Sequence, residues 1–581
     1  MTLERDTSSA QCNTHVLKCQ RGEQPVTAAI EERSGRVVVQ GVSAPDPSGA
    51  FPAPAAHAPG ALSDTRLTVL IAGALFALAA WPLLLVELPP LQDLPNHVAT
   101  AHIIAHPDVY PEFTFNGLFK SNALLTLWLH LLGGHGLFGA ARLFVALVLA
   151  VNALALPVFV LHFAGRRHLL VAMLFVWPLV HSYSVAMGFL NFAFAFGLSL
   201  ILLTVIDRQR ERPTFRRGAG IALLACAVWY AHPFPLMVVG VLVALYAATR
   251  AGGPARLAAA LTLAAPMAPA ALLALVSAQQ HLIKAEHSTA AAATAGTFFY
   301  LNPWETVAHL WLDVCGGFSR WGSMTIVPAL LLPLYAWNRR LVERPFFSRT
   351  AMGVLAAAYV ALPMMMSNWW HLNCRLVPFL WAGLALRLPG RLPRPVAALL
   401  VACALSFSAV TGVDYLRLDR DRAAFTAGID AVPERASLLP LMFEQTRTSV
   451  FTSSLTHAWG YYTVAKSTAA APLVFGVERS YPITYRDFPP PTLIPPVFDR
   501  FAQWNATPER VCELLRQPTD RPACAVIWRD VWSGFWSQAE PRFTHVLTWA
   551  MPSETRSVIP ASYHRVFAAG ALEIFARETG H

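Results

Sequence analysis

Charged residues are scarce in this chain. Only 13% of its 581 residues are Asp, Glu, Lys or Arg, and 55% are hydrophobic, whereas charged residues make up about a quarter of a soluble globular protein. This composition excludes one large soluble domain. Several apolar runs of roughly 20 residues, long enough to cross a bilayer, favour a protein embedded in a membrane.

Cysteine patterns and a cleaved leader are also missing. The eight cysteines contain no C-x-x-C pair of the kind that binds zinc. Cys512 and Cys524 are the plausible disulfide pair, on condition that they face an oxidising compartment. No apolar segment lies at the extreme N-terminus, so we expect no signal peptide. We expect residues 1–65, polar and then rich in Pro, Ala and Gly, to form a disordered cytoplasmic tail.

The net charge of +10 would suggest a nucleic-acid partner in a soluble protein. Here the basic residues gather in short connections between apolar runs, which is the pattern that orients membrane proteins. We therefore expect membrane lipids and no nucleic acid as partners.

Eleven apolar runs predict the spanning helices of a transmembrane domain over residues 66–413. They lie at about 67–87, 141–164, 168–186, 188–206, 218–232, 233–249, 257–278, 322–338, 349–367, 371–387 and 395–413. With the N-terminus inside, sixteen Lys or Arg residues fall in internal connections and three, Lys120, Lys284 and Arg320, fall outside. This asymmetry follows the positive-inside rule. It would be reversed if the apolar run 123–138 also spanned, so that run is expected to lie at the interface or re-enter the membrane.

The predicted fold class is therefore an all-α polytopic membrane domain, N-terminus in and C-terminus out, followed by a small α/β domain at 414–581. Two long external loops are expected at 88–140 and 279–321. Strands are expected in the last domain at Ala523–Trp528 and His545–Trp549, with a terminal hairpin from Tyr563 to Phe575. In a bacterium this arrangement places the protein in the inner membrane with its active site facing the periplasm.

The first external loop opens with Gln92-Asp93-Leu94-Pro95-Asn96-His97. Pro95 restricts Leu94 to extended conformations, so the loop can hold Asp93 in a fixed position near the interface. A carboxylate there can deprotonate an acceptor hydroxyl or amine, or bind a divalent cation. The alternative is that Asp93 caps a helix through 95–105.

The Leu-Gln-Asp-Leu-Pro-Asn-His stretch, together with this topology, resembles the GT-C superfamily of integral-membrane glycosyltransferases, which includes protein O-mannosyltransferases and lipid A aminoarabinose transferases. The resemblance implies transfer of a sugar from a polyprenyl-phosphate-linked donor to a lipid, glycan or protein acceptor. Asp93 would act as general base or as a metal-linked acid. Asp108, Glu112 and His97 are candidates for a second acid or for ligands of a divalent cation.

A lipid-phosphate donor also needs cations near the external face to stabilise the leaving phosphate. The candidates are Lys120, Lys284, Arg320, Arg375, His371 and His232. For Lys284 and Arg320 the alternative is a solvated loop position, and for Arg375 it is a side chain that reaches up to the interface.

Two other functions fit the sequence. The first is a transporter or flippase of a lipid-linked saccharide, although no internal repeat of the kind common in transporters is visible. The second is a non-catalytic membrane scaffold whose periplasmic domain binds a partner through six tryptophans. These are Trp459, Trp504, Trp528, Trp532, Trp536 and Trp549.

Overall fold

The computed structural model describes residues 61–250, 254–285, 298–315, 317–336, 344–366, 369–444, 454–468, 481–486, 501–515 and 521–578. The expected N-terminal tail lies almost wholly outside these residues. Residues 60–581 form one compact unit, and everything below concerns that unit.

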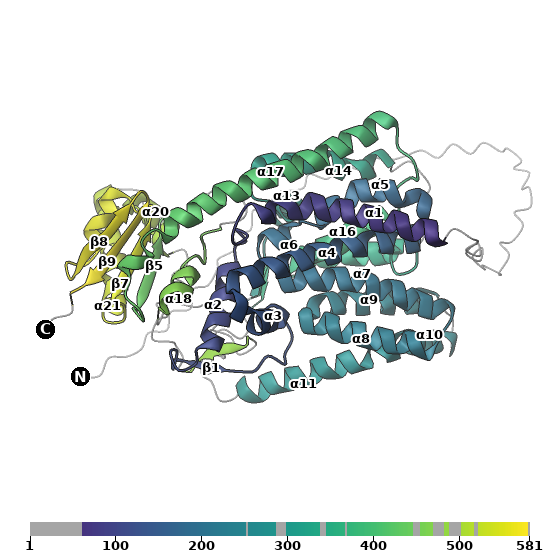
Figure 1. Ribbon diagram of the computed structural model, residues 1–581, viewed down its shortest axis with the longest axis horizontal. Helices are drawn as coiled ribbons and strands as arrows, with labels where there is room; N and C mark the ends of the chain where they lie inside the picture. The colour runs from purple at the N-terminus through teal and green to yellow at the C-terminus, as the bar shows by residue number, and fades with distance from the viewer. Residues whose placement is uncertain are drawn as a thin grey trace, which may run out of the picture. The chain divides into compact units, whose positions relative to one another are not determined.

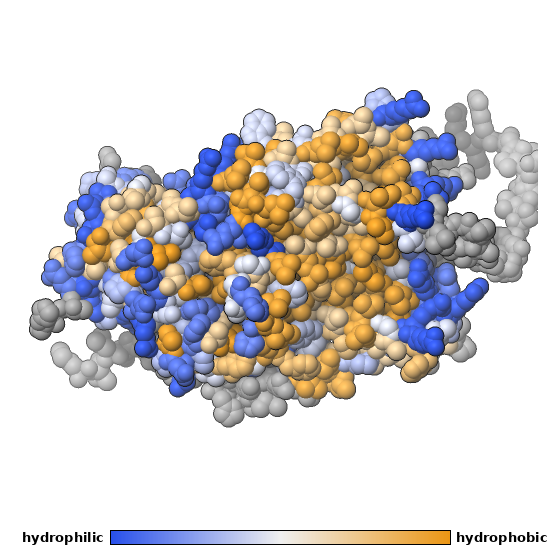
Figure 2. Space-filling model, viewed as in Figure 1, coloured by the Kyte–Doolittle hydropathy of each residue, from blue (hydrophilic) through white to orange (hydrophobic). Residues whose placement is uncertain are grey.

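Apolar helices make up its first part. Six of the described helices are long and apolar enough to cross a bilayer: Asp64–Leu84, Leu137–Ala164, Arg166–Ala186, Leu190–Glu211, Ala260–Ser277 and Arg394–Ala431. Shorter apolar helices lie at Pro233–Thr249 and Arg349–Ala361. The apolar side chains form a broad band with polar side chains at both ends, as Figure 2 shows. This distribution is the one that a hydrocarbon layer imposes.

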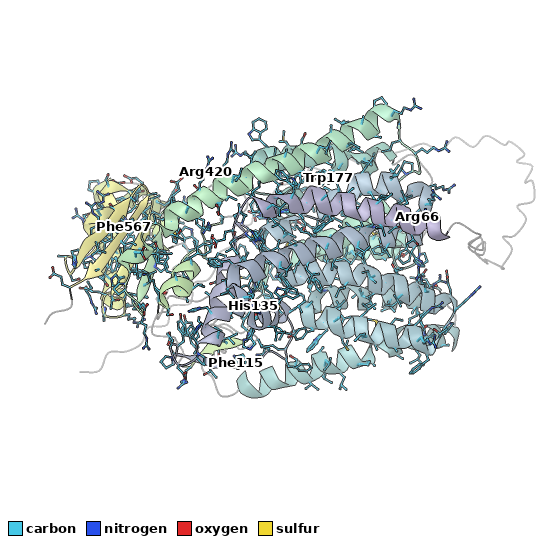
Figure 3. The ribbon with its side chains drawn as sticks, viewed as in Figure 1. Arg66, Phe115, His135, Trp177, Arg420 and Phe567 are labelled. Carbon is cyan, nitrogen blue, oxygen red and sulfur yellow. A yellow bond between two sulfur atoms is a disulfide. The ribbon has the colours of Figure 1, made fainter. Side chains whose placement is uncertain are left out.

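Each of the eleven runs that we expected to span contains helical structure among its described residues. The helices of this part are α1 (Ala61–Ala80), α4 (Leu137–Ala164), α5 (Arg166–Val176), α6 (Tyr183–Ala186), α7 (Leu190–Glu211), α8 (Phe215–Ala231), α9 (Pro233–Arg250), α10 (Pro254–Ala264), α11 (Ala268–Ala285), α13 (Pro303–Cys315), α14 (Arg320–Ala336), α15 (Arg349–Ala361), α16 (Val377–Ala385) and α17 (Arg394–Thr426). α4 packs against α1 and α7, and α17 packs against α14 and α1 (Figure 1). Arg66 and Arg420 lie at opposite ends of this bundle, with Arg420 toward the C-terminal strands (Figure 3).

Four predicted spans have other boundaries in the structure. α17 continues to Thr426, thirteen residues beyond the expected end at 413, so its last turns leave the apolar band as a charged helix. The run 257–278 is divided at Pro266 into α10 and α11, because proline cannot donate the helical hydrogen bond. The runs 349–367 and 371–387 are shortened, and two-residue strands β3 (Met365–Met366) and β4 (Trp369–Trp370) lie between them.

The loop at 88–140, which we expect to be the first external loop, is itself structured. It contains α2 (Leu94–Ala105), β1 (Phe113–Phe115) and α3 (Leu124–Leu132). Nine residues of α-helix extend about 14 Å, so α3 by itself is shorter than a hydrocarbon core of about 30 Å; the placement of 123–138 at the interface stays a prediction. In the second loop, β2 (Phe298–Phe299) pairs with β3, and α13 follows it.

The C-terminal part is an α/β domain. Its mixed four-stranded sheet has the order β5-β7-β9-β8, where β5 is Leu438–Met442, β7 His545–Trp549, β8 Tyr563–Ala569 and β9 Leu572–Arg577. β5 and β7 run parallel and the other pairs antiparallel. The strand His545–Trp549 and the terminal hairpin are thus confirmed.

The expected strand Ala523–Trp528 is wrong, because these residues belong to helix α21 (Arg521–Ala539). Trp528, Trp532 and Trp536 recur every fourth residue and are all buried in one cluster, a helical spacing. The same domain contains α19 (Phe501–Trp504) and α20 (Pro508–Leu514). A disulfide joins Cys512 to Cys524, as the sequence allowed.

Two segments of the C-terminal part contact the first external loop. Strand β6 (Ile483–Tyr485) pairs antiparallel with β1, and helix α18 (Gly460–Lys466) packs against α2. A β-carbon on Gly460 would lie 2.5 Å from the carbonyl oxygen of Pro95, so only glycine permits this approach. The loop that holds α2 and β1 and the C-terminal segments that hold α18 and β6 therefore pack together into one layer at the end of the bundle.

Candidate active site

Asp93 stands at the N-cap position of α2, but its carboxylate does not cap the helix. The structure gives the N-cap no side-chain hydrogen bond. The helix expected at 95–105 is present, yet Oδ1 of Asp93 lies 3.4 Å from Nε2 of His457 instead. The side chains of Asp93 and His457 are 14% and 8% exposed. The carboxylate is thus committed to a histidine from the C-terminal part and keeps its second oxygen for another partner.

The turn between α6 and α7 holds the backbone of this loop. The N–H groups of Gln92 and Asp93 donate to the carbonyls of Ala186 and Met187, at 3.3 and 3.1 Å. Gly188 follows with φ +85°, and a β-carbon there would lie 2.8 Å from the Asp93 nitrogen. Glycine alone fits this conformation without strain and without displacing Asp93.

His97, one helical turn after Asp93, belongs to the same cluster. Burial lowers the pKa of its imidazole to about 4, the Asp93 carboxylate partly offsets this, and His457 adds to the lowering. His97 is therefore neutral near pH 7. A neutral imidazole beside the carboxylate adds no positive charge that would weaken Asp93 as a base.

Arg375 lies on the far side of the same turn. It is 7% exposed, and its guanidinium carbon is 5.0 Å from the centroid of the Phe189 ring and 5.6 Å from that of Phe192. Its Nη1 donates to Nε2 of His232. Asp93 is close enough to act on it electrostatically. A buried cation and a buried carboxylate are thus positioned by one short segment, residues 183–192.

The other candidates from the sequence fall in three places. His371 has φ +54°, and its ring lies 5.9 Å from that of Tyr183 and 6.2 Å from that of Phe189, so it borders the Arg375 cluster. Lys120 is buried and donates to the Tyr481 carbonyl at 3.1 Å. Lys284 stands at the end of α11, and Arg320 is the exposed first residue of α14.

The second-acid candidates lie beyond the far end of α2. This helix has 12 residues, so its ends are about 18 Å apart, and Asp108 and Glu112 follow its last residue. Asp108 is exposed, and the Glu112 carbonyl accepts from the Arg486 N–H at 2.8 Å. Within the described residues, no three His, Cys, Asp or Glu side chains are arranged to hold a metal ion.

Sequence reasoning missed His457 and Gly188. His457 is far from Asp93 along the chain, in a segment with no motif, and no local pattern could connect the two. Gly188 offered a signal: it lies between two apolar runs separated by almost nothing, where only a tight turn can reverse the chain.

No family model matches the chain, and no curated protein matches it. Solved structures that resemble it include ArnT from Cupriavidus metallidurans bound to undecaprenyl phosphate, at 13% identity and TM-score 0.46, covering 90% of this chain and 99% of that one. ArnT from the same organism in the apo state gives 13% identity and TM-score 0.49, covering 89% and 98%. The arabinofuranosyltransferase AftD from mycobacteria gives 14% identity and TM-score 0.44, covering 89% of this chain and 40% of that one. The TM-scores of these three structures are all below 0.5.

Proposed function

We propose that this protein is a membrane glycosyltransferase that moves a sugar from a polyprenyl-phosphate-linked donor to an acceptor at the external face. The observation that carries the proposal is the state of Asp93. It is a largely buried carboxylate at the start of an external loop, it is not used as a helix cap, and one oxygen is held by His457. The resemblance of the first loop to GT-C enzymes agrees with this reading.

In the proposed reaction Asp93 acts as the base. An acceptor hydroxyl or amine gives its proton to the free carboxylate oxygen as it attacks the sugar carbon. The bond between that carbon and the donor phosphate oxygen breaks, and the lipid phosphate leaves with the electron pair. No atom changes its oxidation state, so the reaction needs no oxidant or reductant.

His457 is the positioning residue for this base. With its proton on Nε2, the imidazole donates to Oδ1 and turns Oδ2 toward the acceptor. The segment 454–468 then completes a site that begins more than 300 residues earlier in the chain. This gives the C-terminal part a role in catalysis besides any role in choosing the acceptor.

Arg375 supplies the charge for the leaving phosphate. It is held between two phenyl faces and a histidine, so it is oriented before the donor binds, which is how electrostatic stabilisation becomes effective. The described residues do not present a ligand set for a divalent cation, so no step is assigned to a metal.

Placement in a bacterial inner membrane with this site facing the periplasm belongs to the same proposal. It is supported by the arginine-rich connections and by the disulfide between Cys512 and Cys524, which oxidising compartments permit.

The experiment compares Asp93→Asn with Asp530→Asn, an exposed acid of α21, in membranes supplied with a labelled polyprenyl-linked sugar. Loss of a general base costs about 100-fold to 10,000-fold in rate. We expect that loss for Asp93→Asn alone. Equal transfer by both variants would refute the assignment.

A further inference from the structure

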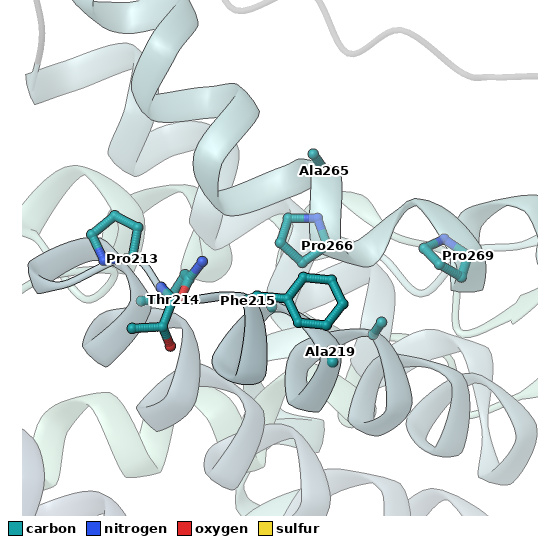
Figure 4. Close-up of a pocket in the computed structure, with 10 residues that line it drawn as sticks. Pro213, Thr214, Phe215, Ala219, Ala265, Pro266 and Pro269 are labelled. Atoms are coloured by element: carbon teal, nitrogen blue, oxygen red, sulfur yellow. The ribbon is translucent and has the colours of Figure 1, made fainter.

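The end of the bundle opposite to Asp93 carries a groove with no assigned role. It lies between the start of α8 and the break between α10 and α11, and it measures about 580 Å³, within the range of about 300–1,000 Å³ typical of ligand sites. Figure 4 shows the Phe215 ring near Pro266, Pro269 and Ala219. Small and apolar residues form most of its lining, which suits an acyl chain.

The groove has a polar end. Gln209 is 6% exposed, and its amide oxygen accepts from the Thr214 N–H at 3.0 Å. Its amide nitrogen faces the Gly218 side, where a β-carbon would lie 3.8 Å away. Both Gln209 and Gly218 line the groove, so a hydrogen-bond donor stands where the apolar wall ends.

Basic residues adjoin this end of the groove in the sequence. Arg212 and Arg216 are exposed and directly flank the lining residues Pro213 and Phe215. Arg217 is instead bound to the loop, because it donates to the carbonyls of Arg208 and Arg212. The two exposed guanidinium groups therefore remain available for an anion above an apolar groove.

Phe215 itself is 91% exposed. A phenyl ring this exposed is costly in water, so we expect lipid to cover it. The combination of an apolar groove, a buried amide at its mouth and two exposed arginines selects one class of occupant.

We propose that this groove binds an anionic phospholipid of the cytoplasmic leaflet, with one acyl chain against Gly218, Ala222 and Pro266 and its phosphate at Arg212 and Arg216. Basic pockets between helices on the cytoplasmic side recognise anionic head groups in this way. The site is independent of Asp93 and of the proposed transfer.

The test measures phosphatidylglycerol and phosphatidylcholine retained by the full-length protein, by native mass spectrometry after titration in detergent. A basic residue near a lipid head group contributes about 1 kcal/mol. We therefore expect Arg212→Gln/Arg216→Gln to weaken phosphatidylglycerol binding about 30-fold, which is about 2 kcal/mol at 1.4 kcal/mol per factor of ten. Gly218→Leu should also displace the lipid by filling the groove.

The matched control removes two positive charges elsewhere on this end of the helix bundle. Arg66→Gln/Arg391→Gln changes two other exposed arginines and should leave binding within about twofold. Equal binding of both lipids by the wild-type protein would overturn the proposal. An equal loss of phosphatidylglycerol binding in the control variant would also overturn the proposal. So would cross-links showing that a second copy of the chain fills the groove.

Discussion

Replacing Gly188 by alanine should disable the proposed site without unfolding the membrane domain. Alanine at φ +85° costs about 1–2 kcal/mol of backbone strain. Its methyl group would also lie 2.8 Å from the Asp93 nitrogen and 3.0 Å from the Asp93 β-carbon. Ordinary contact begins at about 3.5 Å, so Asp93 must retreat by roughly 0.7 Å. A misplacement of about 1 Å can reduce a rate about 100-fold, and we expect a loss of that order.

Gly165 provides the matched control. It has φ +84° and ψ 167°, but a β-carbon there would meet nothing within 4 Å, so Gly165→Ala adds backbone strain of its own without moving Asp93. The assay follows transfer of label from the polyprenyl-linked sugar in membranes containing equal amounts of each protein. Gly165→Ala should keep activity within a few-fold of wild type. A folded Gly188→Ala protein with wild-type transfer would show that the turn does not position the site.

Three further changes test other parts of the structure. His457→Gln, which can still donate to Asp93, should lower kcat about tenfold at unchanged KM, and His457→Ala should lower kcat further. If both variants had the kcat of the wild type, a positioning role for His457 would be excluded. Because the folded pKa of His97 is about 4 and the unfolded value about 6.5, its stability contribution is complete above pH 6.5 and lost as pH falls toward 4. The wild type should therefore lose about 2 kcal/mol more than His97→Gln between pH 7 and pH 5 in thermal unfolding, and identical pH profiles would contradict this. Opening the Cys512–Cys524 loop, whose cysteines are 12 residues apart, should cost about 3 kcal/mol, measured as a lower unfolding midpoint of Cys512→Ser; no change would mean that the bond is absent.

The membrane part of the fold could be predicted because hydrophobic length and arginine placement are local properties. Runs of apolar residues predicted the helices, and charge asymmetry predicted that 123–138 does not span. The boundaries failed where polar helices continue past the bilayer, as in α17, since hydropathy ends at residue 413 while the helical hydrogen bonds do not. Residues 523–528 of α21 are predicted as a strand because six residues are too few to separate the two periods.

The site could be predicted only in part. Asp93 could be singled out from the sequence because proline residues and apolar neighbours mark its loop. Arg375 could be singled out because a cation near the apolar band is energetically costly. Their arrangement depends on tertiary contacts. His457 lies beside Asp93 because α18 packs on α2. Lys120, which the sequence suggested as a phosphate-binding cation, instead donates to the carbonyl of Tyr481. No spacing rule contains that information.

The central claim is that Asp93 is the base of a transferase. The most direct measurement incubates wild-type and Asp93→Asn protein in vesicles with a labelled polyprenyl-linked sugar and separates the products by mass spectrometry. The account predicts a new sugar–acceptor bond and free lipid phosphate with wild type, and neither with Asp93→Asn. Intact labelled lipid moved across the bilayer without any new bond would contradict it and indicate a flippase, while unchanged product with Asp93→Asn would place the base elsewhere.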